Sequence, residues 1–146
     1  MKLKKLTVDD LSEVFDLIEQ FERTIADRPD SGRQGDILCQ ISERGGAVLG
    51  AEVDGQIIGT CTVVICPNLS WSGRPYSIIE NVIVDERYQG RGVGKALMKE
   101  AQSLAKIAGC YKVSLMTGSS RASTHKFYEA CGFTGNKKGF QLRFDA

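Results

Sequence analysis

The spacing of hydrophobic and polar residues predicts alternating strands and helices along the first third of the chain. Residues 2–7 form a candidate strand, and a helix follows whose apolar side chains share one face. That face consists of Leu11, Val14, Phe15, Ile18, Phe21 and Ile25. A polar loop over 26–35 separates this helix from a second, short helix expected at 36–44.

The rest of the chain predicts a mixed β-sheet flanked by helices. Segments 47–53 and 56–66 flank Asp54-Gly55, a strong signal for a two-residue hairpin, so these two strands should be antiparallel. A strand at 76–84 follows, then a helix with an apolar face at Val93, Leu97, Ala101, Leu104, Ala105 and Ala108. We further expect a strand at 111–116, a helix at about 120–131 and a last strand pair at 133–135 and 139–144. This order predicts a single α+β domain spanning residues 1–146 with one mixed sheet.

Composition narrows the class of partner. The 146 residues are 42% hydrophobic, enough for one core, and the formal net charge is +1, so no overall field favours nucleic acid or an anionic membrane. The N-terminal segment lacks a continuous apolar stretch, and nothing approaches the roughly 18 apolar residues of a membrane span. The expectation is a soluble, cytoplasmic protein that binds neither nucleic acid nor membrane.

The cysteines and the histidine argue against a metal site. The five cysteines contain no Cys-x-x-Cys pair and are odd in number, which disfavours both a zinc site and a disulfide framework. His125 is the chain's only histidine and cannot form a metal cluster by itself. We therefore expect no metal and interpret the cysteines as reduced core thiols.

The segment between 76 and 98 predicts an anion site. An apolar strand runs into a basic, glycine-rich turn and then into a helix, so the glycines lie at a helix N-terminus. N–H groups of the first helical turn have no partner within the helix, the helix dipole is positive there, and glycine lets a phosphate approach the backbone. Arg87, Arg91 and Lys95 surround this turn, so a pyrophosphate is the expected ligand, and a glycine-rich turn without a ligand is the alternative.

The spacing of the glycines does not fit two other glycine-rich motifs that bind phosphate. A Walker A loop requires glycine where Gln89 stands and a hydroxyl where Ala96 stands. A dinucleotide fingerprint requires Gly-x-Gly-x-x-Gly after an early strand, whereas Gly90, Gly92 and Gly94 alternate and follow about eighty other residues. Nucleoside triphosphate and dinucleotide sites are therefore disfavoured.

The order Gln89-x-x-Gly92-x-Gly94 resembles the acetyl-CoA signature of the GNAT superfamily of N-acetyltransferases. The strings at 109–113 and 126–133 are similar to its glucosamine-6-phosphate N-acetyltransferase branch. The resemblance implies that the parallel strands 76–84 and 111–116 splay apart around the pantetheine arm of acetyl-CoA. Main-chain groups of Val82, Ile83 and Val84 would pair with the pantetheine, and those of Arg91, Gly92, Val93, Gly94 and Lys95 with the pyrophosphate, flanked by Arg87 and Gln89.

Two residues are candidates for the chemistry. The resemblance gives Tyr128, in Phe-Tyr-x-x-x-Gly-Phe, the role of a general acid at the departing thiolate; the alternative is a core tyrosine. Strand alternation places Glu80 on one face with Ile78, Val82 and Val84, where burial would favour a general base. A structural ion pair is the alternative for Glu80. His125 lies one helical turn before Tyr128, as an active-site group or a hydrogen-bonded helix residue.

These observations predict an enzyme that transfers an acetyl group directly from acetyl-CoA to a primary amine of a small molecule. Asn81 departs from the Glu-Asp pair usual in the glucosamine-phosphate enzymes, so the acceptor stays open. The alternatives are a catalytically silent acyl-CoA-binding module and an enzyme that acetylates a protein amine. The alternating segment 139–144 at the chain end suggests a homodimer, because its edge needs protection.

Overall fold

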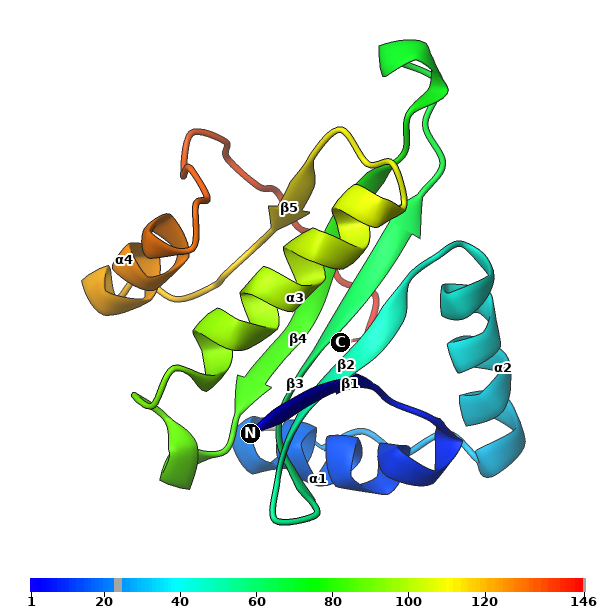
Figure 1. Ribbon diagram of the computed structural model, residues 1–146, viewed down its shortest axis with the longest axis vertical. Coiled ribbons are helices and arrows are strands. Elements are labelled where there is room, and N and C mark those ends of the chain that lie inside the picture. Colours follow the sequence, from blue (N-terminus) through cyan, green and yellow to red (C-terminus); the bar gives the residue numbers. More distant parts are fainter. Residues whose placement is uncertain (23–24, 146) are drawn as a thin grey trace. The chain divides into compact units, whose positions relative to one another are not determined.

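The computed structural model describes residues 1–22 and 25–145 (Figure 1). Contacts divide the chain into two compact units, Met1–Leu115 and Met116–Ala146. The first unit contains all strands of the described residues: β1 (Lys2–Lys5), β2 (Ala47–Val53), β3 (Gln56–Cys66), β4 (Tyr76–Val84) and β5 (Val113–Leu115). Its helices are α1 (Leu11–Phe21), α2 (Ser31–Glu43) and α3 (Val93–Ile107), with 3-10 turns at Val8–Asp10, Trp71–Gly73 and Glu86–Tyr88. The second unit contains α4 (Ala122–Ala130).

The strands form one mixed sheet in the order β1-β2-β3-β4-β5. The first three pairings are antiparallel, and β4 pairs with β5 in parallel. Asp54 and Gly55 join β2 to β3 with φ values of 50° and 77°, as a two-residue hairpin turn requires. The predicted α+β class, the hairpin and the parallel pair are confirmed.

Helices cover both faces of this sheet. On the α1 face, α1 and the chain after β1 bury a cluster made of Leu6, Leu11, Val14, Leu17, Val48 and Ile57. On the opposite face, here called the α3 face, a Cβ added to Gly59 of β3 would lie 2.9 Å from Val93 Cγ1 and 3.2 Å from Leu97 Cδ1. The absence of a side chain at Gly59 therefore lets the first turn of α3 pack directly on the sheet, beside the end of β4.

The helix ends differ from the prediction in α1 and α2. The expected helix reached Ile25, and its residues 23–24 lie outside the described part of the chain. In the structure α1 ends at Phe21 because Glu22 is extended, which leaves Phe21 42% exposed and Ile25 60% exposed, while the buried face gains Leu17. Helix α2 begins at Ser31, five residues earlier than expected, because the side chain of Asp30 accepts a hydrogen bond from the Arg33 N–H at 2.8 Å.

A bulge in β4 breaks the expected alternation. Thr60 of β3 lies opposite Ile83. Two positions along β3, Thr62 lies opposite Glu80, so β4 carries one extra residue between them. Asn81 lies in this stretch with a φ of 54°, a left-handed conformation that asparagine tolerates better than most residues.

The prediction that Glu80 shares a face with Val82 and Val84 is therefore wrong. Residues directly opposite on paired strands share a face, so Glu80 and Ile83 both lie on the α1 face. Val84 lies opposite Gly59, on the α3 face. The inserted residue shifts every side chain after it to the other face.

The expected strands at 133–135 and 139–144 are absent among the described residues, which contain no strand after β5. Alternation makes a strand possible, but a strand forms only where another strand pairs with its N–H and C=O groups. Phe140, Leu142 and Phe144 are 80–91% exposed. Strand β5 is also shorter than the predicted 111–116, whereas α4 closely matches its predicted helix.

Candidate functional site

The edge of β4 that faces β5 is paired along only part of its length. The pairing covers Ser77 to Ile79, opposite Val113 to Leu115, while β4 continues to Val84. The Asp85 N–H donates to the Ile58 carbonyl of β3 at 2.8 Å, and a strand presents successive residues to opposite edges. Val84 therefore directs its main-chain groups to the free edge. There its carbonyl accepts a hydrogen bond from Gln89 Nε2 at 3.1 Å.

The free edge leads through a turn to the start of α3. Gly90 and Gly92 have φ values of 75° and 82°, and Gly92 is the N-cap of α3. A Cβ at either glycine would meet no atom within 4 Å. Because the first intrahelical bond runs from Ala96 N–H to the Gly92 carbonyl, the N–H groups of the preceding helical residues have no partner within the helix. The turn thus combines open space at Gly90 and Gly92 with N–H groups that have no partner within the helix, beside the end of β4.

The cations of the turn are arranged unequally. Arg91 and Lys95 are exposed, and the Arg91 guanidinium lies 5.5 Å from the ring centre of Tyr88. Arg87 instead forms an ion pair with Asp85, Nη2 to Oδ2 at 3.0 Å and Nε to Oδ1 at 3.2 Å. Hydrogen bonds from Arg87 hold the pKa of Asp85 below its usual value, and the same pair raises the pKa of Arg87.

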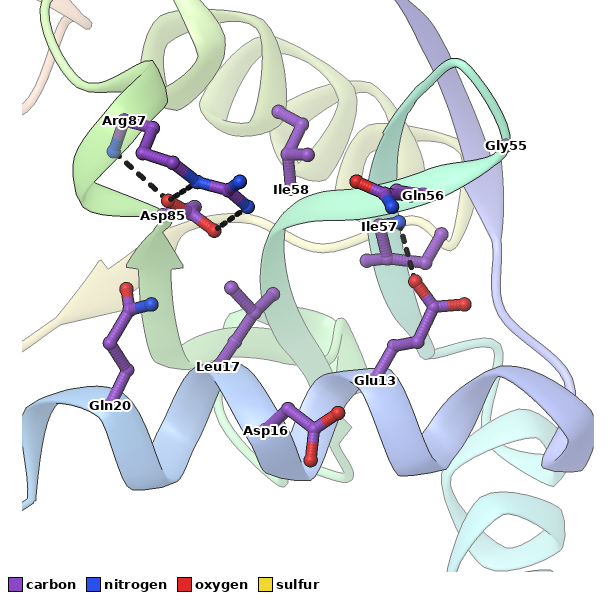
Figure 2. A pocket seen from close by; sticks show the side chains of 10 residues that line it. All are labelled: Glu13, Asp16, Leu17, Gln20, Gly55, Gln56, Ile57, Ile58, Asp85 and Arg87. Carbon is purple, nitrogen blue, oxygen red and sulfur yellow. Dashed lines mark hydrogen bonds and ion pairs between the residues drawn. The ribbon is translucent and has the colours of Figure 1, made fainter.

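Asp85 and Arg87 lie at one end of a cavity of about 440 Å³ (Figure 2). Its other walls are α1, through Glu13, Asp16, Leu17 and Gln20, and the β2–β3 hairpin, through Gly55, Gln56, Ile57 and Ile58. Glu13 is fixed there because its Oε2 accepts the Ile57 N–H at 2.8 Å. The cavity therefore belongs to the side of α1, and no residue of 89–95 lines it.

Glu80 does not lie in a buried apolar stripe. Its side chain is exposed on the α1 face, opposite Thr62, which itself lies opposite Val48 of β2. Next along β4, Asn81 is also exposed. The bulge thus presents a carboxylate and an amide one after the other, where the free edge of β4 begins.

The second unit holds the other candidate for proton transfer. Tyr128 is half-buried near the end of α4, and its ring packs edge-on against Phe127 and Phe133, with centroid distances of 5.0 and 6.1 Å. His125 is exposed, and its Nε2 donates to the Ser119 carbonyl at 2.8 Å. The structure thus gives His125 a hydrogen bond to the loop before α4.

The cysteines are free thiols in varied surroundings. Cys61 and Cys110 are buried, and burial raises the pKa of both, that of Cys61 to about 12. Cys39 is exposed, so interpreting all five as core residues is wrong. Within residues 1–22 and 25–145, no three His, Cys, Asp or Glu side chains are grouped as a metal site. No helix of that part of the chain is both long and apolar enough to cross a membrane.

Asp85 is a site residue that the sequence patterns above did not identify. It is the one charged side chain in the buried core of the described residues, 6% exposed. A usable signal was present, since Asp85 is an ionisable residue directly after an apolar strand and two positions before an arginine.

Comparison with known proteins places this geometry in a family. The model of the acetyltransferase (GNAT) family matches residues 9–133. Glucosamine 6-phosphate N-acetyltransferase of Trypanosoma brucei brucei is 31% identical over 99% of this chain and 95% of its own length. Aminoglycoside N(6')-acetyltransferase type 1 of Stenotrophomonas maltophilia is 28% identical over 79% of this chain and 78% of its own.

A solved structure of a protein from Agrobacterium tumefaciens str. C58 is also similar, with 33% identity and a TM-score of 0.88. It covers 99% of this chain and 100% of its own. The match of the family model to most of the chain and the near full-length relatives agree with the interrupted strand pairing and the glycine turn. The chain therefore belongs to the acetyltransferase (GNAT) family.

Proposed function

We propose that this protein transfers the acetyl group of acetyl-CoA directly to a primary amine of a small molecule. The observation that carries the proposal is the free edge of β4, which runs from Glu80 to Val84 and leads into the N-terminus of α3. A linear ligand with amides at one end and a pyrophosphate at the other matches this arrangement. Coenzyme A has that form, and the family to which the chain belongs uses acetyl-CoA.

The donor would bind along this path. Main-chain groups of Val82 and Val84 pair with the pantetheine amides, and Val84 offers its N–H at the free edge, because Gln89 Nε2 already binds its carbonyl. The alternation of the strand directs the main-chain groups of Ile83 to β3 instead. The pyrophosphate lies over the turn and accepts from N–H groups of the segment Arg91–Lys95, which includes Gly92, Val93 and Gly94. The charges of Arg91 and Lys95 favour the phosphates, and Arg87 and Gln89 flank the turn.

Direct transfer needs a base for the acceptor and an acid for the thiolate. Glu80 takes a proton from the acceptor ammonium, directly or through water, and the free amine attacks the thioester carbonyl. The tetrahedral intermediate loses a second proton from its nitrogen to water and collapses, the C–S bond breaks, and Tyr128 donates its phenolic proton to the departing sulfur. Solvent then returns a proton to Tyr128. The products are the N-acetylated amine and coenzyme A.

The acceptor is a small molecule in the relatives named above, which by their names act on glucosamine 6-phosphate or on an aminoglycoside. Both acceptors carry a primary amine on a sugar. The exposed Glu80 supports an acceptor that arrives as a cation, because a carboxylate attracts an ammonium group. A peptide or protein amine is the second candidate.

A homodimer is part of the proposal. Phe140, Leu142 and Phe144 alternate along the C-terminal segment and expose most of their surface. Burying three large apolar side chains against a second copy would remove them from water. If the C-terminal segment also paired as a strand with the second copy, the main-chain groups of these three residues would gain hydrogen-bond partners.

The donor site is tested by thermal unfolding with coenzyme A. A ligand bound by the folded state alone stabilises by about 2.7 kcal/mol at a hundredfold excess over Kd, so the Tm should rise with CoA and much less with ATP or NAD. Gly94→Leu should abolish this rise, because a side chain in the first turn of α3 blocks the phosphates. Gly35→Leu, in α2 where a Cβ meets nothing within 4 Å, is the matched control and should keep it. Equal shifts with all three nucleotides would contradict the proposal.

The role of Tyr128 is tested by Tyr128→Phe after an amine acceptor is found by thiol release across amino sugars, aminoglycosides, polyamines, amino acids and peptides. Loss of the phenolic proton should lower kcat by roughly 10²–10⁴ while leaving acetyl-CoA affinity unchanged. Full kcat in the variant would make Tyr128 a packing residue.

Glu80→Gln tests the base through the pH profile. A base that takes the proton of the acceptor ammonium contributes most at low pH, where little of the amine is free. The variant should lose about 10²-fold or more at neutral pH and recover in part at high pH, where the free amine is abundant. An unchanged profile would assign Glu80 a structural role.

The dimer is tested by light scattering at tens of micromolar protein. The expected mass is twice the 16.0 kDa of the chain. Phe140→Ser with Leu142→Ser should shift the mass to that of a monomer. A monomeric wild type would overturn this part of the proposal.

A further inference from the structure

The turn between β4 and α3 is held by hydrogen bonds that converge on Asp85. Its carboxylate accepts from the Arg87 N–H at 2.9 Å and from two nitrogens of the Arg87 side chain. Its own N–H donates to the Ile58 carbonyl, and its carbonyl accepts the Tyr88 N–H, both at 2.8 Å. One residue thus ties the start of the turn to β3 and closes the 3-10 turn that follows.

Arg87 is directed toward the α1 side of the molecule. Its side chain and that of Asp85 face each other at the end of the cavity formed by α1 and the β2–β3 hairpin (Figure 2). Helix α3 packs on the other face of the sheet, where Val93 and Leu97 lie beside Gly59. The Arg87 guanidinium is thus held by Asp85 on the α1 side; it also lies 5.8 Å from the ring centre of Tyr88, and its side chain is largely exposed.

A second tie fixes the middle of the same turn. Gln89 Nε2 donates to the Val84 carbonyl, so the side chain that begins the glycine motif binds the end of β4. The Glu86 N–H contacts Gln20 Oε1 of α1 at 3.4 Å. Residues 86–89 are thus anchored to β4 and α1 before the chain reaches Gly90.

We infer that Asp85 is a positioning residue for the donor site: through Arg87 it fixes the turn that presents the α3 N–H groups to the pyrophosphate, and Arg87 does not itself contact the ligand. The inference deepens the proposed function and rests on it. Its physical basis is that N–H donors held in place before binding lose less entropy when the phosphate arrives. A loosened turn must be ordered by the ligand, which weakens binding.

The inference is tested by isothermal titration of three ligands into the full chain: CoA, 3'-dephospho-CoA and 4'-phosphopantetheine. Asp85→Ala and Arg87→Ala should each lower the affinity for CoA and for dephospho-CoA to the same extent, by roughly 10- to 100-fold. This is the range expected for the loss of hydrogen bonds to a charged group. The double variant should bind no more weakly than either single variant, since the two residues act as a unit. The affinity for phosphopantetheine, which lacks the pyrophosphate, should fall much less in these variants.

Two controls separate positioning from general destabilisation. Arg28→Ala removes another exposed arginine that binds carboxylates, Asp16 and Glu19, each at 2.7 Å, and should lower Tm without changing the Kd for CoA. Asp85→Asn keeps an oxygen for the Arg87 N–H and should restore part of the affinity lost in Asp85→Ala. It also serves as the test variant if Asp85→Ala does not fold.

Three results would overturn the inference. In the first, Arg87→Ala lowers the affinity for CoA but not that for dephospho-CoA, which would mean that Arg87 binds the 3'-phosphate. In the second, Arg87→Ala weakens CoA while Asp85→Ala and Asp85→Asn do not. In the third, all these variants keep wild-type affinity. Failure of the wild type itself to bind CoA would instead contradict the proposed function.

Discussion

A strand must satisfy its main-chain groups on both edges, and β4 does so on the β5 side only as far as Ile79. Beyond that point the strand continues to Val84, held by β3 alone. The bulge at Asn81 begins where this one-sided stretch begins, and the turn and α3 follow directly where it ends. The interruption of one parallel pairing thus creates a polar edge and aligns it with a helix N-terminus.

The position of α3 depends on an equally local feature. Gly59 on β3 gives the first turn of α3 its close contact with the sheet, through Val93 and Leu97. The turn between β4 and α3 is fixed on the other side by Asp85, whose ion pair faces α1. Packing on one face and an ion pair on the other therefore hold the glycine turn in place.

Much of the fold follows from local sequence patterns. Asp54-Gly55 predicts the β2–β3 hairpin, and hydrophobic periodicity predicts the span of β4 and the buried face of α3. Both signals depend on only a few neighbouring residues. The bulge at Asn81 and the missing strand at 139–144 were not predictable in the same way, because both depend on how one strand pairs with another. The early end of α1 and the early start of α2 depend on single residues, Glu22 and Asp30.

In the candidate site, too, some features were predictable from local sequence and others depend on three-dimensional packing. The glycine turn was found from sequence because a phosphate site needs glycine and cations at fixed spacing beside a helix start. Three features of the site follow only from three-dimensional packing: the ion pair of Arg87 with Asp85, the hydrogen bond of Gln89 to Val84 and the exposure of Glu80. A sequence pattern names the residues near a ligand, but it does not say which of them touch the ligand and which hold the others.

The most direct test of the account is residue-resolved hydrogen exchange by NMR, with and without CoA. If CoA binds along the free edge of β4 and at the start of α3, it should slow exchange at the Val84 N–H and at the N–H groups of Val93, Gly94 and Lys95. The N–H of Asp85, already bonded to β3, should exchange slowly in both states and serves as an internal reference. New protection confined to other parts of the chain, with these four N–H groups unchanged, would contradict the claim that the free edge of β4 and the start of α3 form the donor site.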